Sequence, residues 1–308
     1  MKSTTSTSSN FPLLTLAIFA TVLLLQPSPL FAKFHDRKIF VSKFGSQTKS
    51  LTDLQHVRAA VRSSALASLG DIPQSVKAEL VAHAEAEMKQ GRGYVALTAH
   101  DFMEFFRNGN RMHYQDKLHS RRERISVLLI GHLLDRETHP GSTKYVDEIV
   151  NGVWMLLEES TWCYPAHLSL QGTHDHLPDP DHVAVDLNAG EVAKFLAWVK
   201  LLMHEQFDKV SPVVNRRIDH ELQRRIFDAY LRVNFGWEGF GGHHSVNNWN
   251  IWVNGNILKA AIFTLDDHSL FTKVLNKTLH SADYFLDGYG EDGRFEKGKR
   301  VGFFIFVF

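Results

Sequence analysis

The sequence of 308 residues predicts an all-α fold arranged as a ring of helical hairpins, an α/α toroid. Apolar residues recur at helical spacing from residue 51 to about residue 285, while the alternating pattern of β-strands is almost absent before the last few residues. Long loops follow alternate helices. The hairpins lack the fixed repeat of a tetratricopeptide or ankyrin solenoid, so a closed or partly closed ring fits them better.

The first half of the chain predicts five helices. Thr52 and Asp53 can cap the first of them, and Thr98 or His100 can open the third. The turn sequence HPGS at residues 139–142 separates the fourth helix from the fifth. The five helices are expected at residues 52–69, 71–88, 98–106, 112–134 and 143–159.

Two of these helices carry residues whose environment can be predicted. Charge runs usually form a solvated helix face, so we expect this rather than a binding site for Arg121, Arg122 and Arg124 on the fourth helix. Apolar residues at helical spacing on the fifth helix are expected to point inward: Tyr145, Ile149, Val153, Leu156 and Leu157.

The second half of the chain begins with a long loop, residues 160–188. It is too polar and too rich in Pro and Gly to be a helix, and loops of this length inside compact domains are usually functional. Four helices are expected after it, at residues 191–206, 212–235, 250–263 and 267–285. The second of these carries five apolar residues at helical spacing: Ile218, Leu222, Ile226, Ala229 and Val233.

The composition is that of a soluble globular protein, with 44% hydrophobic and 22% charged residues. Its 34 basic and 34 acidic residues leave a net charge of zero, so no basic field predicts a nucleic-acid partner. Cys163 is the single cysteine, so no internal disulfide can form and the fold must rest on packing. A thiol nucleophile is not expected, because no cysteine-enzyme motif surrounds Cys163.

Residues 1–32 are typical of a signal peptide. Lys2 precedes an apolar run at residues 11–25, and Ala32 supplies the small residue at the cleavage site. The alternative is a membrane anchor, but this run is shorter than the ~20 residues that a bilayer span requires. We therefore expect cleavage after Ala32, a polar lead-in at residues 33–50, a periplasmic or secreted location and no integral membrane span.

The most informative stretch is the glycine-rich loop FGWEGFGGHHSVNNWN at residues 235–250. Glycine is costly to order and unpaired amides are costly to bury, so this loop is poor material for a core. Aromatic faces beside His and Asn donors suit a sugar ring instead. The candidate residues of this loop are Trp237, Glu238, His243, His244, Asn247, Asn248, Trp249 and Asn250.

Two other loops carry candidate residues. Trp162, Tyr164 and His167 could line a carbohydrate cleft, or this segment could be a packed loop whose tryptophan fills the core. Residues 287–298 form a tight acidic turn whose spacing does not match an EF-hand.

The His/Asp cluster at residues 174–182 is the best candidate for metal binding. Its spacing matches no standard zinc motif, and a solvated polar loop is more common. We therefore expect neither a metal nor a cofactor.

Five motifs resemble the heparinase II/III-like family of polysaccharide lyases, and their order and spacing match as well. They are TWCYPAH (161–167), LPD (177–179), VDL (185–187), NNWN (247–250) and DGYGEDG (287–293). The resemblance covers most of residues 53–298, so it is more specific than any single motif. It implies an incomplete α/α toroid followed by an antiparallel β-sandwich, a periplasmic or secreted location, and cleavage of uronate-containing polysaccharide by β-elimination.

The resemblance also implies roles for individual residues. Removing the C5 proton of a uronate leaves charge on its carboxylate, which an amide can neutralise while a base takes the proton. Asn248 and Asn250 match the family motif as carboxylate-binding candidates, and the choice between them stays open. His243 and His244 are second-choice groups for proton transfer. The expected substrate-binding residues are Trp162, Tyr164, His167, Trp237, Glu238, Asn247 and Trp249.

The chain departs from the family pattern after the acidic turn. The family carries its catalytic tyrosine there, whereas no tyrosine follows Tyr289, residues 299–308 form an atypical apolar tail, and the β-sandwich is absent. The expected function is thus a lyase-like fragment, its toroid domain spanning residues 51–298, with little or no activity. The alternatives are a carbohydrate-binding helical module without catalysis, and a metal-dependent helical enzyme that uses the cluster at residues 174–182.

Overall fold

The computed structural model describes residues 38–45, 54–89, 93–240 and 246–288. These residues form helices joined by turns and loops, and none of them lies in a strand. The all-α prediction is therefore confirmed for the described part of the chain, while the closed ring stays a prediction. The predicted signal peptide, the apolar tail, and the candidates His243 and His244 lie outside the described residues.

The five predicted helices of the first half begin and end close to the predicted positions, whereas α2 is an additional helix within the segment predicted as a polar lead-in. Thr98 caps α5, where its hydroxyl accepts from the Asp101 amide and the Asp101 carboxylate accepts in return from the Thr98 backbone. The elements are α2 (Ile39–Phe44), α3 (Leu54–Ala67), η2 (Ser68–Asp71), α4 (Gln74–Lys89), α5 (Ala99–Asn108), α6 (Met112–Thr138) and α7 (Val146–Leu157).

The second half differs from prediction at two places. The first helix begins at Leu187 rather than 191, because the Asp186 carboxylate accepts from the Ala189 amide and caps it there. The predicted helix 212–235 contains a π-helical turn and ends at Arg232. The elements are η3 (Pro165–Gln171), α8 (Leu187–Val210), α9 (Pro212–Leu222), η4 (Gln223–Phe227), α10 (Asp228–Arg232), η5 (Gly236–Glu238), α11 (Asn248–Thr264) and α12 (His268–Asp287).

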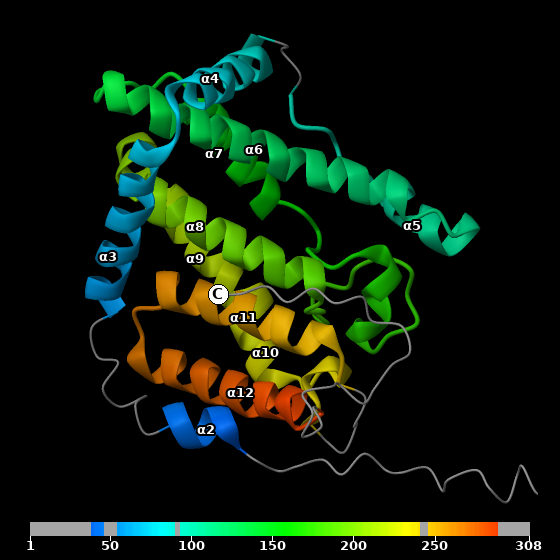
Figure 1. Ribbon diagram of the computed structural model, residues 1–308. Coiled ribbons are helices and arrows are strands. Elements are labelled where there is room, and N and C mark those ends of the chain that lie inside the picture. The colour runs from blue at the N-terminus through cyan, green and yellow to red at the C-terminus, as the bar shows by residue number, and fades with distance from the viewer. Residues whose placement is uncertain (1–37, 46–53, 90–92, 241–245, 289–308) are drawn as a thin grey trace, which may run out of the picture. The chain divides into compact units, whose positions relative to one another are not determined.

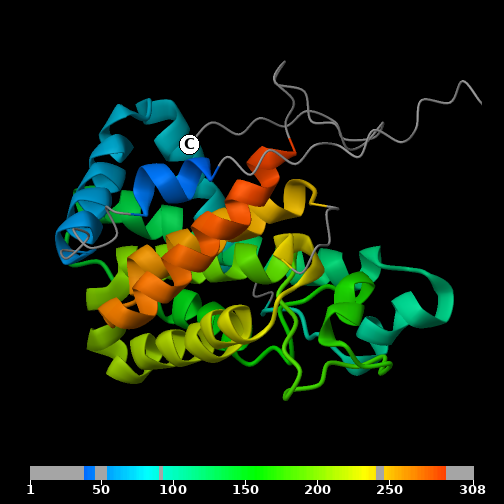
Figure 2. The same ribbon diagram turned by 90° about the horizontal axis from the view of Figure 1, so that it is seen from below.

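The described helices between residues 36 and 287 form one compact unit. Within it α2 packs on α12, α12 on α11, and α11 on α8, as Figure 1 and the perpendicular view in Figure 2 show. On the other side, α8 also contacts α9 and α7, and α6 packs between α7 and α4. The end of the loop between α7 and α8 contacts η5, where the Trp237 Nε1–H donates to the Val185 carbonyl oxygen at 2.9 Å.

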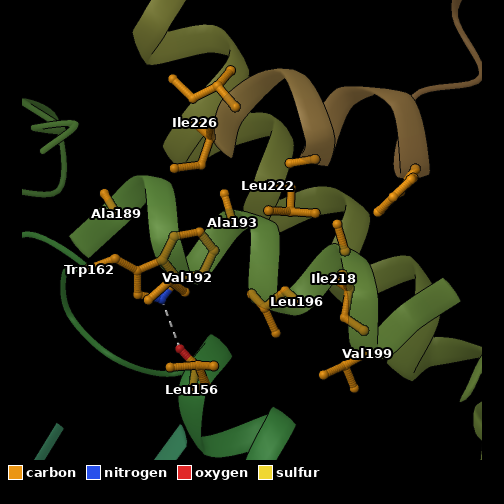
Figure 3. Packing of buried hydrophobic residues seen from close by; sticks show 14 of the residues in the cluster. Leu156, Trp162, Ala189, Val192, Ala193, Leu196, Val199, Ile218, Leu222 and Ile226 are labelled. Carbon is orange, nitrogen blue, oxygen red and sulfur yellow. Dashed lines mark hydrogen bonds between the residues drawn. The ribbon is translucent and has the colours of Figure 1, made fainter. Parts of the chain in front are cut away.

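The core lies mainly between α7, α8, α9 and α11. The five residues that were expected to point inward from α7 and its start are fully buried. Trp162 lies in this core and is 2% exposed, and its Nε1–H donates to the Leu156 carbonyl oxygen at 3.0 Å (Figure 3). Trp162 therefore fills the core, as the packed-loop alternative predicted, instead of lining a cleft. Buried core residues in Figure 3 include Ala193, Leu196, Val199, Ile218, Leu222 and Ile226.

The prediction of a solvated basic face on α6 is wrong for two of its three arginines. Arg121 and Arg124 are 6% and 8% exposed. Arg121 Nη1 lies 2.9 Å from the carboxylate of buried Glu159, and Arg124 Nη1 lies 2.7 Å from that of Glu87. A guanidinium can be buried when carboxylates and carbonyl groups satisfy its N–H donors, and the sequence pattern alone did not identify these partners.

Candidate functional site

The first pair of the candidate site joins α6 to the loop after α7. His119 Nε2 lies 2.6 Å from Tyr164 Oη. Partial burial and the nearby Arg122 guanidinium lower the pKa of His119, and burial raises the pKa of Tyr164. Both groups are therefore neutral near pH 7, so the Tyr164 hydroxyl donates and the His119 ring nitrogen accepts. This arrangement holds the largely buried phenol oxygen next to a proton acceptor.

The second pair lies beside the first. His167 Nδ1 is 2.7 Å from Oδ2 of Asp186, whose side chain is fully buried. Asp186 also accepts from the backbone amides of Tyr164 and Ala189, at 3.1 and 2.9 Å. Because the carboxylate acts as an acceptor, the Nδ1–H of His167 donates to it, and Nε2 keeps its lone pair when the ring is neutral. An acid that fixes the tautomer of a histidine in this way prepares it as a base.

The start of α11 forms the third part of the site. Asn247 caps the helix by accepting from the Trp249 amide at 2.9 Å. The Trp249 ring packs on His167 with centroids 4.4 Å apart. Asn248, which precedes Trp249 in the sequence, is exposed. The N-termini of α8 and α11 therefore both lie near His167. The Asp186 carboxylate occupies the first of them, whereas α11 has the neutral cap Asn247, so the start of α11 is the one that can favour a further anion.

Asn250 lies in the interior, contrary to its expected place at the substrate. It is fully buried, and its amide donates to the carbonyl oxygens of Trp237, Glu238 and Ser281 at 3.3, 3.0 and 2.9 Å. A further contact of 3.0 Å reaches the Ser281 hydroxyl. These bonds occupy the amide donors, so Asn248 is the exposed asparagine of the pair.

Trp237 and Glu238 are also buried, so the glycine-rich loop is core material over part of its length. Trp237 Nε1–H donates to the Val185 carbonyl oxygen at 2.9 Å, next to Asp186. Burial raises the pKa of Glu238 to about 7, although the ammonium of Lys277 lies 3.1 Å away and opposes the shift. The expectation that this loop is poor material for a core is wrong here. The Trp237 indole has a partner, whereas both carboxylate oxygens of Glu238 are buried without a hydrogen bond among the described residues and face the Lys277 ammonium. Trp237 and Glu238 therefore belong to the core beneath the site, where Trp237 bonds to the residue next to Asp186 and Glu238 to Asn250.

An open hollow of about 400 Å³ lies next to the first pair, between α6 and α8. His119 and Arg122, one turn apart on α6, line one side of it, and Lys194 of α8 lines the other. Arg122 donates to Asn188 at 2.7 Å. Neither His119 nor Arg122 was predicted from the sequence as a residue of this site. Their spacing of three residues placed them on one helix face, but their pairing with the loop after α7 has no local signal.

The predicted metal alternative gains no geometric support in the described residues. There, no group of three or more His, Cys, Asp and Glu side chains could hold a metal ion. His182 pairs with Asp179 at 2.6 Å, and His176 stacks on Phe106 with centroids 4.5 Å apart. The acidic turn at residues 287–298 lies outside the described residues, apart from its first two.

The fold and the site together define an all-α protein that carries the pairs His119–Tyr164 and His167–Asp186 close to the starts of α8 and α11. A comparison of the chain with models of protein families found no match, and a comparison with curated proteins found none either. Among the helices of the described ranges, none is long and apolar enough to cross a membrane.

Proposed function

We propose that the chain binds uronate-containing polysaccharide and cleaves it by β-elimination, as a polysaccharide lyase. The observation that carries this proposal is the adjacency of the His119–Tyr164 and His167–Asp186 pairs beside Trp249. Together they supply a candidate base and a candidate acid within one largely buried site. The motifs that resemble the heparinase II/III-like family agree with the proposal. A periplasmic or secreted location forms part of the same proposal.

The proposed reaction uses these groups in one elimination step. His167 Nε2 removes the C5 proton of the uronate, the C4–O bond breaks, and a C4–C5 double bond forms. The leaving oxygen takes the proton of the Tyr164 hydroxyl. His167 then returns its proton to solvent, and Tyr164 regains one from water through His119. Asn248 and the N-terminus of α11 stabilise the charge that develops on the uronate carboxylate.

Tyr164 is our candidate for the phenol group that the family carries after the acidic turn. The family carries its catalytic tyrosine after the acidic turn, where this sequence has none beyond Tyr289. Tyr164 supplies a phenol from another segment, which lets us propose activity where the sequence predicted little or none. His243 and His244 stay second-choice candidates outside the described residues.

A carbohydrate-binding module without catalysis is the second candidate. The observation that favours it is the position of Tyr164, which is 9% exposed and already bonded to His119. A phenol held in this way has limited access to a leaving group. Binding would then rest on Asn248, Trp249 and the exposed edge of His167.

The decisive experiment incubates the purified chain with heparin, heparan sulfate, chondroitin or alginate and follows the ultraviolet absorbance of the unsaturated product. We expect absorbance to rise with at least one polymer, and to stop rising in His167→Ala. The matched control is His280→Ala, which alters an exposed histidine on α12. Binding by calorimetry without any absorbance change would contradict the lyase and establish the binding module. Absence of both would contradict both candidates.

A further inference from the structure

A second aromatic side chain lies next to the candidate site. Trp252 follows Trp249 by three residues on α11, so the two lie on the same side of the helix. Trp252 is 37% exposed and is one of the few large apolar side chains at the surface of the described residues. An indole at a polar surface presents a flat apolar face with a polar N–H, which suits the face of a sugar ring.

Lys194 reaches the same place from α8. Its Nζ lies 6.0 Å from the centroid of the Trp252 ring. Within the described part of the chain no hydrogen bond or ion pair joins Lys194 to another residue, and its side chain is half-buried. Burial lowers the pKa of Lys194, and the charges of Lys259 and Arg122 act in the same direction, against Glu191. A half-buried ammonium without a carboxylate partner is costly, so an anion placed here would be favoured.

The hollow between α6 and α8 connects this place to the first pair of the site. Lys194 lines it together with His119 and Arg122. Glu191, the neighbouring carboxylate on α8, lies 3.5 Å from Arg122 and is therefore partly neutralised. Because α8 and α11 pack side by side (Figure 1), Trp252 and Lys194 already lie next to each other in the structure.

We propose that Trp252 and Lys194 form a second sugar subsite that takes an acidic sugar residue of the bound chain. The indole contacts the face of the sugar ring, and the ammonium binds its carboxylate or sulfate group. This subsite rests on the proposed function, since it holds a neighbouring residue of the same polysaccharide. It defines the substrate class further: acidic groups recur along the polymer, as in a polyuronate or a sulfated glycosaminoglycan, and are not confined to the residue at His167.

The test measures binding of three hexasaccharides to the full chain by calorimetry: one from alginate, with carboxylates only, one from heparin, with sulfates as well, and neutral cellohexaose. The variants are Lys194→Gln and Trp252→Ala. The matched control is Lys209→Gln, because Lys209 is exposed on the same helix and lies about 22 Å further along it. We expect each test variant to weaken binding of an acidic hexasaccharide about tenfold, and the control to leave it unchanged.

The possible outcomes separate this subsite from the function on which it rests. Weaker binding of both acidic hexasaccharides by Lys194→Gln supports a subsite for either anion, and weaker binding of the heparin hexasaccharide alone assigns it to sulfate. If the wild type binds an acidic hexasaccharide and neither variant changes its affinity, the subsite is overturned while the proposed function stands. Equal wild-type affinity for cellohexaose would overturn the acidic class. No binding of any hexasaccharide by the wild type would contradict the proposed function itself. Thermal unfolding of each variant verifies that it is folded.

Discussion

His167 and Trp249 are in ring contact, with centroids 4.4 Å apart. This contact joins the loop after α7 to the first turn of α11. Asp186, which holds His167, is also the residue that caps α8, and Asn247 caps α11 next to Trp249. The residues that begin two helices therefore also position the candidate base. Substitutions here should separate effects on chemistry from effects on folding, because an isosteric amide can still cap a helix.

The substitution Asp186→Asn tests the proposed tautomer of His167. An asparagine oxygen can accept from the Ala189 amide and keep the cap, but it does not hold the Nδ1–H tautomer as a carboxylate does. On the polymer that the wild type cleaves, we expect kcat to fall about 10²-fold or more with a small change in KM. The control is Asp181→Asn, in the exposed loop before α8. An unchanged kcat would remove His167 from the role of base.

Two of the three asparagines of the NNWN motif, Asn250 and Asn248, should respond to substitution in different ways. Asn250→Ala removes the amide that satisfies the carbonyl oxygens of Trp237, Glu238 and Ser281, so we expect a loss of about 2–4 kcal/mol in the free energy of unfolding. Asn248→Ala changes an exposed side chain, so we expect a change within about 0.5 kcal/mol and weaker binding of uronate. Denaturant unfolding and calorimetry on both variants check this. Equal stability losses would contradict the assignment.

The asparagines also illustrate what the sequence could and could not predict. Helix positions followed from local signals, and the helix start at Thr98 and the inward face of α7 are confirmed. Local composition suggested that the glycine-rich loop was poor material for a core, because polar residues are costly to bury without partners. The partners of Asn250 come from α12 and η5, and those of Arg121 from the loop after α7 and the segment before α5. Such long-range pairing has no local pattern, so the motif marked the region of the site but not the role of each residue.

Glu238 should make the stability of the protein depend on pH. Burial raises its pKa from 4.5 to about 7, so the folded chain holds a proton that the unfolded chain releases. The stabilisation is complete below pH 4.5 and is lost as pH rises through about 7. Over that window we expect the free energy of unfolding to fall by roughly 3 kcal/mol through this one group.

The measurement is denaturant unfolding of the wild type and of Glu238→Gln between pH 5 and 8. Glutamine cannot titrate, so the difference between the two curves isolates Glu238 from other groups. One such group is His132, whose pKa burial lowers to about 4 and which destabilises the fold in acid instead. Glu79→Gln, at an exposed position of α4, is the control. Parallel curves for wild type and Glu238→Gln would contradict the buried, protonated carboxyl group.

Cys163 offers a direct test of how tightly the loop after α7 is packed. Its side chain is fully buried between Trp162 and Tyr164, its Sγ lies 3.5 Å from the Tyr164 carbonyl oxygen, and burial raises the pKa of the thiol well above its ordinary value. Because labelling requires an exposed thiolate that attacks the disulfide of the reagent, we expect no labelling of the native chain by an aromatic disulfide reagent at neutral pH. One equivalent should react after unfolding, since the sequence holds a single cysteine.

The rate of that labelling should report local opening of the same loop. Trp162→Phe removes the donor to the Leu156 carbonyl oxygen while it keeps an aromatic ring in the core. Loss of one buried hydrogen bond, about 1 kcal/mol, should raise the population of the open loop and the labelling rate about fivefold to tenfold. Trp198→Phe, a change at an indole that packs on Phe263 away from the loop, serves as the control. Rapid labelling of the native wild type would show instead that the loop opens freely, and Tyr164 would then lack the fixed position that the proposed chemistry requires.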